Sequence, residues 1–483
     1  MSEMRVGRPE STLASEDIQG KKGFMYFIAV VAALGGMLFG YDTGVIAGAL
    51  IFINKTFHPT VWQQELVVSM VVAGAFFGAL CSGKLSNVFG RRKVLLFTSI
   101  TFIIGTIICS FAPNIWTLII GRFILGIAVG IASYAAPLFI AEISMPDKRG
   151  LMVLLNSIFL TGAQALSFLV SFFLAAYFSH TLSWRLMVGA AIIPSILLLV
   201  GMYLAPSSPR WLIMKGRKKE ALKVLHKIRD FNKVDREFNE IEHSLGFKHG
   251  GWTELFSKKL RLVLIIGLGL GILQQFVGIN TVMYYGPEIF EQVGFHNESA
   301  QIIATFGMGC LNFLLTLAAM FTVDKFGRKA LMIIGMGISM VSLITLGMVM
   351  KIGPECIAGG KVIAVLSLVF YMCGYAYSIG SIFWLMISEV FPLHIRSVAM
   401  GFVAGMQWAA NFLVSATFLS VLYAFGAANT FWLYAGMCLF TILFTIFYLP
   451  ETKGVSLETI EENLEHGVKA KHLGNKHGMR KLY

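Results

Sequence analysis

The sequence predicts an all-α membrane protein in which twelve transmembrane helices form two halves of six, with both termini in the cytoplasm. Three observations predict this fold. The 483 residues are 56% hydrophobic and only 13% charged, whereas a soluble protein carries roughly twice that charged fraction. Twelve apolar runs between Phe24 and Leu449 have the length, about 17–25 residues, that crosses a bilayer. Charged motifs at the ends of these runs recur once in each half of the chain.

Lys and Arg indicate the orientation, because short cytoplasmic loops carry an excess of both. With the loops assigned to alternating sides, only Lys55, Arg185, Lys351 and Lys361 fall opposite the N-terminus, and Arg122 lies within a span. The remaining 34 of the 39 Lys and Arg lie on the side of the N-terminus. Both termini are therefore expected in the cytoplasm, in a multi-pass protein of the plasma membrane. The same bias explains the net charge of +13 without any nucleic acid.

The linker between the halves is polar and basic, and its apolar spacing predicts two amphipathic helices, at about Gly216–Arg229 and Arg236–Leu245. Another helix is expected to begin near Ser456, in the C-terminal tail. The expected segments, in order, are a cytoplasmic tail (1–23), a first bundle of six helices (24–205), a cytoplasmic helical linker (206–258), a second bundle (259–450) and a second tail (451–483).

The halves repeat their charged motifs at the cytoplasmic ends of matched spans. Glu142 precedes Arg149 by seven residues after the fourth span, and Glu389 precedes Arg396 by seven after the tenth. Two like-oriented halves around a central site are a transporter architecture. Alternatively, Lys and Arg lie there only because they set topology, but this does not explain the matched acids. We expect a gate of ion pairs between the halves that closes the cytoplasmic side when the protein faces outward and breaks when it opens inward. It is formed by Arg91, Glu142 and Arg149 with Asp324, Arg328, Glu389 and Arg396.

The seventh span carries an unusual number of polar side chains. An amide in hydrocarbon is costly unless it faces a partner, a cavity or water. Several neutral donors and acceptors at one depth suit an uncharged, polyhydroxylated ligand, whereas the alternative is hydrogen bonding between neighbouring helices. The polar residues of this span are Gln274, Gln275, Asn280, Tyr284 and Tyr285.

A regular helix cannot direct all these side chains at one ligand, because Gln275 points away from the sector of Gln274 and Asn280 lies off to one side. Gly278 and Gly286 predict a bend or an unwound turn there. Broken helices near the middle of the membrane are how transporters build binding sites. This stretch is therefore expected to be both a wall of the site and a moving gate.

Asp42 places a carboxylate within the first span, where it costs about 2.5–3.5 kcal/mol unless it is paired. Arg122, within the fourth span, is the candidate partner. One reading is a static structural ion pair. The other is proton coupling, in which the proton affinity of Asp42 changes as it meets or leaves Arg122.

Further residues within spans could contact a ligand. Trp384 lies beside Gly380 and Ser381 in the tenth span, and an aromatic ring can stack on the apolar face of a sugar. Asn312, Gln407 and Asn411 are further buried amides; packing is the alternative for each. The sequence lacks a phosphate-binding loop, a metal-binding His pair and a Ser/His/Asp set. We therefore expect neither an enzyme nor a bound cofactor or metal. The energy for transport is expected to come from a gradient.

Ten motifs in order resemble those of the sugar porter family of the major facilitator superfamily, over essentially the whole chain. The chain looks most like the bacterial galactose- or arabinose-proton symporters, which implies a place in the cell inner membrane. The matching motifs begin at Gly83 (Gly83…Gly90-Arg-Arg), Gly121 (Gly-Arg-Phe), Glu142 (Glu142…Arg149-Gly), Trp184 (Trp-Arg), Ser208 (Ser-Pro-Arg-Trp-Leu), Gln274 (Gln-Gln-Phe-Val-Gly-Ile-Asn), Tyr284 (Tyr-Tyr-Gly-Pro), Asp324 (Asp-Lys-Phe-Gly-Arg-Lys), Trp384 (Trp384…Glu389-Val-Phe-Pro…Arg396) and Pro450 (Pro-Glu-Thr-Lys-Gly).

The resemblance implies a proton-coupled monosaccharide symporter that works by alternating access. Asp42 would accept the proton, with Arg122 as its partner. The expected partners are a monosaccharide, a proton and membrane lipid, with no nucleic acid, and the functional unit is expected to be a monomer. The residues implied to line the sugar site are Phe39, Gln164, Gln274, Gln275, Asn280, Tyr284, Asn312, Trp384 and Gln407.

Four positions depart from the family pattern: Asn87, Ser157, Ser207 and Ser381. Asn87 and Ser207 remove acids from the inner gate, and Ser157 stands where many members place a sugar-binding Gln. With Ser381 in place of the usual proline, a backbone N–H is restored and the helix break is expected to be softer. These departures leave the identity of the sugar open. They also leave two alternatives, a facilitative uniporter for a sugar or a polyol such as inositol, and a sugar sensor without flux.

Overall fold

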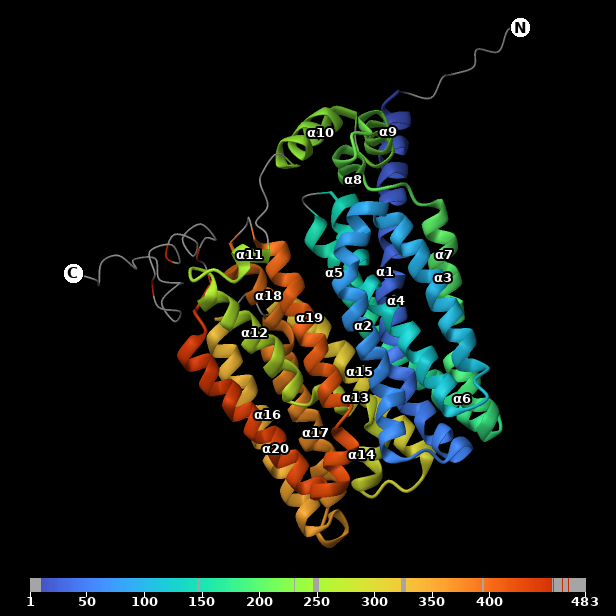
Figure 1. The fold of residues 1–483 in the computed structure, drawn as a ribbon, viewed down its shortest axis with the longest axis vertical. Coiled ribbons are helices and arrows are strands. Elements are labelled where there is room, and N and C mark those ends of the chain that lie inside the picture. The colour runs from blue at the N-terminus through green and yellow to red at the C-terminus, as the bar shows by residue number, and fades with distance from the viewer. Residues whose placement is uncertain are drawn as a thin grey trace, which may run out of the picture.

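The computed structural model describes residues 10–145, 148–229, 231–245, 252–322, 327–392, 395–453, 455, 463 and 468. Within these ranges, twelve helical spans are long and apolar enough to cross a membrane, and no strand occurs. The spans form two bundles that lie side by side (Figure 1). The predicted all-α fold with twelve transmembrane helices is therefore confirmed.

Helices of the first half are α1 (Glu10–Phe57), α2 (Val61–Phe89), α3 (Arg91–Ser110), α4 (Ile115–Ile143), α5 (Arg149–Tyr177), α6 (His180–Gly189) and α7 (Ile192–Leu204). The linker holds α8 (Pro209–Met214), α9 (Lys218–Ile228), α10 (Phe231–Leu245) and α11 (Trp252–Leu255). The second half contains α12 (Arg261–Phe276), α13 (Ile279–Tyr284), α14 (Gly286–Gln292), α15 (Glu298–Thr322), α16 (Arg328–Ile352), η2 (Pro354–Cys356), α17 (Gly360–Tyr375), η3 (Ala376–Gly380), α18 (Ser381–Val390), α19 (Arg396–Ser415) and α20 (Phe418–Tyr448).

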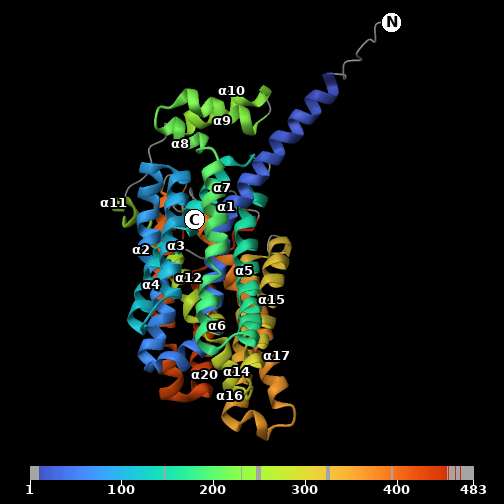
Figure 2. The ribbon, with the colours of Figure 1, turned by 90° about the vertical axis from the view of Figure 1, so that its right-hand side faces the viewer.

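The two halves are not parallel along their whole length. They separate toward the end that carries α8, α9 and α10, and they come together at the opposite end (Figure 1). The linker helices lie over the first half, beside the protruding start of α1 (Figure 2). We call these two ends the linker end and the far end.

Small residues let helices of the first half approach closely. On α1, Gly36, Gly40, Gly44 and Gly48 recur every four residues and therefore share one face. Each faces α5, and a Cβ at Gly40 would collide with the backbone carbonyl of Leu160. Because lipid provides no hydrophobic drive for helices to associate, such close packing is what holds membrane helices together.

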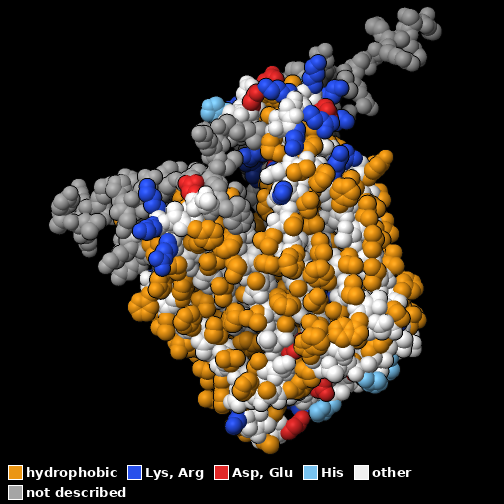
Figure 3. Space-filling view, in the orientation of Figure 1, with side chains coloured by type: hydrophobic (Ala, Val, Ile, Leu, Met, Phe, Trp, Pro, Cys, Tyr) orange, Lys and Arg blue, Asp and Glu red, His pale blue; other side chains and the backbone are white. Residues whose placement is uncertain are grey.

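The halves meet along a seam in which α5 packs on α15 and α2 packs on α19. On the face shown in Figure 3, hydrophobic side chains cover the flanks, while Lys and Arg gather mainly at the linker end. This distribution matches a chain whose flanks face lipid, and it leaves the seam as the place where polar groups from both halves can meet.

The two predicted linker helices are present as α9, close to its expected bounds, and α10, which ends at Leu245 as expected but begins earlier, at Phe231 instead of Arg236. Arg229, just after α9, is 2% exposed. Its guanidinium forms an ion pair with Glu237 at 2.6 Å and donates to the carbonyls of Ile143 and Ser144 at 2.8 and 2.9 Å. These bonds fix the linker to the end of α4. The short α8 was not predicted, and the helix predicted near Ser456 lies outside the described residues.

Candidate functional site

Asp42 on α1 and Arg122 on α4 form a buried ion pair, with 2.6 Å between Oδ1 and Nη1. Their exposed fractions are 1% and 0%. Arg122 Nε also donates to the carbonyl of Val67 on α2 at 3.0 Å. Asp42 Oδ2 and Arg122 Nη2 have no hydrogen-bond partner among the described residues. The pair expected from the sequence is therefore formed, and each member keeps one atom that can take up or give a hydrogen bond.

The end of α12 is joined to two other helices through Gln274. Its amide nitrogen donates to the carbonyl of Ile379, within η3, at 3.2 Å. Its amide oxygen accepts from Gln407 of α19. Gln274 is only 3% exposed. These hydrogen bonds therefore satisfy the polar atoms of an amide that water hardly reaches.

The predicted bend lies at Gly278. α12 ends at Phe276, Gly278 has a φ of 90°, and α13 begins at Ile279. A residue other than glycine rarely adopts this left-handed backbone conformation, because its Cβ is crowded there. The bend brings Asn280 back toward the end of α12, where its amide nitrogen donates to Gln275 Oε1 at 2.6 Å. Gln275, which points away on an ideal helix, thus joins the network through the break.

Beyond the bend, Tyr284 faces α19. Its hydroxyl accepts from Asn411 Nδ2 at 3.3 Å. Gln407 and Asn411 are four residues apart on α19 and therefore lie on one face, so this face contacts both sides of the break.

Two contacts between expected site residues and their neighbours cross from one half to the other. Asn312 Nδ2 on α15 donates to Gln164 Oε1 on α5 at 3.2 Å. The rings of Phe39 on α1 and Trp408 on α19 lie 5.3 Å apart. Trp408 was not predicted, although its place between Gln407 and Asn411 is a signal that could have identified it. The site residues therefore come from both halves.

Trp384 is placed differently from the amides. It lies on α18, directly after η3, and its side chain is 46% exposed with its ring against Phe383. A helix break precedes Trp384 although Ser381 stands in place of the usual proline. The break is visible at Ser378 in η3, whose φ and ψ of −113° are not helical. Ser381 Oγ donates to the carbonyl of Ala376 at 2.6 Å. The chain stays helical from Gly360 to Val390 across this break, and the backbone N–H of Ser381 donates to the carbonyl of Ser378. The softer break expected with Ser381 stays a prediction.

The gate residues form pairs within each half. Arg91 Nη2 lies 2.9 Å from Glu142 Oε1, and Arg328 Nη2 lies 3.1 Å from Glu389 Oε1. The pairing between the halves was predicted only for an outward-facing conformation and stays a prediction; in this conformation the four residues pair within their own halves. The reason is topological: Arg91 begins α3 and Glu142 ends α4, and the two helices pack together, whereas the halves are apart at the linker end (Figure 1).

The other gate residues do not alter this picture. Arg149 is exposed, Arg396 Nε donates to the carbonyl of Phe391 at 3.0 Å, and Asp324 lies outside the described residues.

The repeat between the halves extends to hydroxyl groups that the sequence did not reveal. Ser208 Oγ donates to Glu142 and Thr452 Oγ1 donates to Glu389, both at 2.5 Å.

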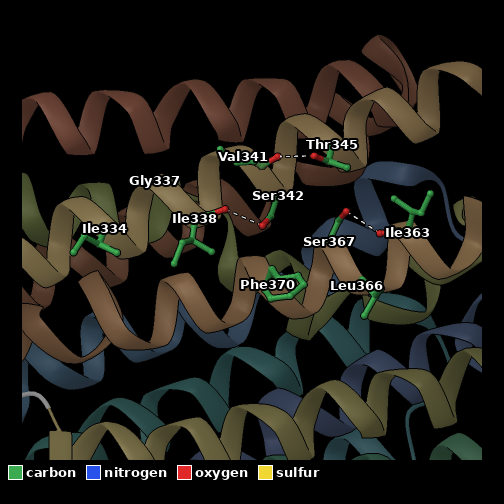
Figure 4. A pocket seen from close by; sticks show the side chains of 10 residues that line it. All are labelled: Ile334, Gly337, Ile338, Val341, Ser342, Thr345, Ile363, Leu366, Ser367 and Phe370. Carbon is green, nitrogen blue, oxygen red and sulfur yellow. Dashed lines mark hydrogen bonds between the residues drawn. The ribbon is translucent and has the colours of Figure 1, made fainter.

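A groove of about 660 Å³ lies on the flank of the second half, between α16 and α17. Its hydroxyl groups donate to carbonyls of their own helices, as Ser342 does to Ile338 and Ser367 to Ile363 (Figure 4). Its lining therefore offers an apolar surface and no amide or charged group, unlike the seam. The lining residues are Ile334, Gly337, Ile338, Val341, Ser342, Thr345, Ile363, Leu366, Ser367 and Phe370.

The model of the family described as sugar (and other) transporter matches residues 28–464. The galactose-proton symporter of Escherichia coli (strain K12) is 40% identical over 464 residues, which cover 95% of this chain and 99% of that relative. The xylose transporter XylE from E. coli in its inward open conformation has a TM-score of 0.79 at 33% identity, covering 91% and 99%. The same proton:xylose symporter, of the major facilitator superfamily, bound to 6-bromo-6-deoxy-D-glucose has a TM-score of 0.73 at 32% identity, covering 92% and 99%.

These likenesses confirm the family and the fold that the sequence motifs predicted. The twelve spans form a major facilitator fold, and the chain is a multi-pass protein of the plasma membrane. The family match extends over both halves and the linker. The chain therefore belongs to the family of sugar (and other) transporters.

Proposed function

We propose that the chain imports a monosaccharide together with a proton by alternating access. The observation that carries this proposal is the buried Asp42–Arg122 pair, in which one carboxylate oxygen and one guanidinium nitrogen have no hydrogen-bond partner in the described part of the chain. The likeness to two proton symporters for sugars supports it. A structural ion pair would be expected to satisfy its remaining atoms, since a half-paired buried charge is costly.

The proton site and the amide network lie next to each other along α1. Phe39 precedes Asp42 by three residues on α1, and its ring contacts Trp408, the neighbour of Gln407. Protonation of Asp42 removes the Coulomb attraction that ties α1 to Arg122 on α4. Movement of α1 then changes the contact of Phe39 with Trp408 on α19. Because Gln407 of α19 donates a hydrogen bond to Gln274, the movement also reaches the amide network.

Neutral amides suit a sugar because its hydroxyl groups both donate and accept hydrogen bonds. Gln164 and Asn312 come from opposite halves, as do Phe39 and Trp408. A sugar that replaces such contacts would draw the halves together, with Trp384 against an apolar ring face. The residues proposed to bind sugar are Phe39, Gln164, Gln274, Gln275, Asn280, Tyr284, Asn312, Trp384 and Gln407.

We infer that the linker end and both termini face the cytoplasm, and that this conformation faces inward. The excess of Lys and Arg at the linker end supports this orientation. The within-half pairs Arg91–Glu142 and Arg328–Glu389 suit an inner gate whose halves are apart. One chain supplies both sides of the site, so a monomer in lipid suffices, without nucleic acid or catalysis. Residues 24–205 and 259–450 are taken as the moving bundles and 206–258 as the linker.

The driving force is adequate for accumulation. One proton that crosses a membrane potential of about 150 mV releases about 3.5 kcal/mol. This sustains a sugar gradient of a few hundredfold.

The test is counterflow of radiolabelled sugars in proteoliposomes that contain the full chain. A panel of hexoses, pentoses and inositol is offered with and without an inwardly directed proton gradient. We expect exchange of at least one monosaccharide without the gradient and uphill accumulation with it. Exchange that a proton gradient never drives uphill would indicate the facilitative alternative, and the absence of any sugar exchange would exclude transport of the sugars tested.

A further inference from the structure

At the far end of the seam, a carboxylate of the first half is buried against the second half. Glu65, in the second turn of α2, is 1% exposed. Its Oε1 accepts from the backbone N–H of Ser420 at 2.7 Å, and its Oε2 accepts from the hydroxyl of Ser420 at 2.8 Å. No ion pair with Lys or Arg involves Glu65 in the described ranges. Both carboxylate oxygens are therefore satisfied by one residue of the other half.

Ser420 is the third residue of α20, so its N–H is one of the donors that a helix leaves unpaired at its start. Thr417 is the residue at the N-cap position of α20, and its side chain makes no capping bond. Glu65 supplies that cap from the opposite half. A negative charge there is also favoured by the helix dipole, which explains how a carboxylate can be buried without a cation.

The capped corner is connected to the proposed sugar site by two adjacent tyrosines. Tyr284 accepts from Asn411, and Tyr285, which follows it, donates to the carbonyl of Ser415 at 2.8 Å. The ring of Tyr285 also stacks on Phe418, the first residue of α20, with 5.0 Å between the ring centroids. The segment after the Gly278 bend therefore holds the α19–α20 corner that Glu65 caps.

We propose that Glu65 is a latch that holds the far end of the transporter closed by capping α20, and that Tyr284 and Tyr285 connect this latch to the sugar site. The proposal rests on alternating access, as stated above. Opening the far end separates α2 from α20, so the cap must break and both groups become hydrated. The bond thus favours the conformation that is closed at the far end and open at the linker end.

A second contact between the halves at the far end serves as the matched control. Lys55 on α1 and Glu298 on α15 form an ion pair in which the side chains are 43% and 34% exposed. Exposed pairs contribute little, because water and salt screen them. Loss of this pair should leave the conformational balance nearly unchanged, although it also joins the two halves.

Hydrogen exchange followed by mass spectrometry tests the latch on the full chain in lipid nanodiscs, without sugar or a proton gradient. In Glu65→Ala we expect exchange at the far ends of α2 and α20 to rise about tenfold, because exchange follows the open population and a bond to a charged group has roughly this effect. Exchange at the linker ends of the helices should fall at the same time. Glu65→Gln, which retains hydrogen-bonding atoms without the charge, and Ser420→Ala should shift exchange in the same direction by about threefold.

The reciprocal change at the linker end is decisive, because loss of a local helix cap would not produce it. A rise confined to the first turn of α20, or a rise throughout the chain, overturns the latch. An equal shift in Glu298→Gln overturns the assignment to Glu65. If Glu65→Ala does not fold, Ser420→Ala decides alone. Since no transport is measured, failure of proton-driven uptake would leave the exchange result standing, and unchanged exchange in a working symporter would remove only the latch.

Discussion

Replacement of Gly278 by alanine perturbs the bend on which the proposed site depends. At a φ of 90°, a residue with a Cβ is strained by about 1–3 kcal/mol. An added Cβ would also lie 2.9 Å from the ring of Tyr434, and overpacking of this kind costs about 1–3 kcal/mol. Together these effects oppose the bent conformation by about 2–6 kcal/mol, unless the segment straightens and carries Asn280 away from Gln275.

Two measurements on Gly278→Ala follow from this estimate. The midpoint of thermal unfolding in detergent should fall, and half-saturation for sugar counterflow should rise at least tenfold, because the bent segment carries Asn280 and Tyr284. Gly307→Ala on α15 is the control, since nothing lies within 4 Å of its Cβ position. If Gly278→Ala matched Gly307→Ala in both measurements, the moving-gate role of the bend would be refuted, and only its role as a wall would remain.

Other predictions concern the proton site, the sugar site and the far end. Asp42→Asn should retain counterflow of bound sugar and lose proton-driven accumulation, because the carboxylate that carries the proton is gone; intact uphill uptake in this variant would contradict the assignment. Gln274→Ala should weaken sugar binding about fivefold to thirtyfold, equivalent to about 1–2 kcal/mol for lost hydrogen bonds, and Gln407→Ala should do the same, both measured by half-saturation of counterflow. Burial raises the pKa of Glu288, although a hydrogen bond from Tyr423 lowers it. The folded state therefore binds this proton more tightly, and stability should fall as the pH rises from the unfolded pKa through the folded one. Glu288→Gln should consequently raise the unfolding midpoint at pH 8 but not at pH 4, and an equal change at both pH values would contradict this reasoning.

Local sequence signals predicted much of the fold and part of the site. Span length and charge bias identified the twelve helices, and the rarity of buried charge identified the Asp42–Arg122 pair. Gly278 predicted the break, because glycine tolerates the left-handed conformation found there. The break then altered which side chains meet, so the contact between Gln275 and Asn280 could not follow from the geometry of an ideal helix.

Contacts between distant helices were less accessible to sequence reasoning. The repeated charges identified residues that form ion pairs at the linker end, but the partner of each residue depends on which helices adjoin in one conformation. Glu65 lies near a helix start among polar residues, where an exposed acid is the ordinary expectation. Only its contact with Ser420 of α20, which lies 355 residues later in the chain, distinguishes Glu65 from an ordinary exposed acid.

Under the proposed mechanism, sugar and proton cross the membrane together. The most direct measurement is the pH of a lightly buffered suspension of energy-depleted cells that express the chain, recorded as a transported sugar is added. We expect an immediate alkalinisation of the medium that is absent in Asp42→Asn, although this variant still exchanges sugar. Sugar entry without any change in pH in the unsubstituted chain would contradict proton coupling and identify a facilitative transporter.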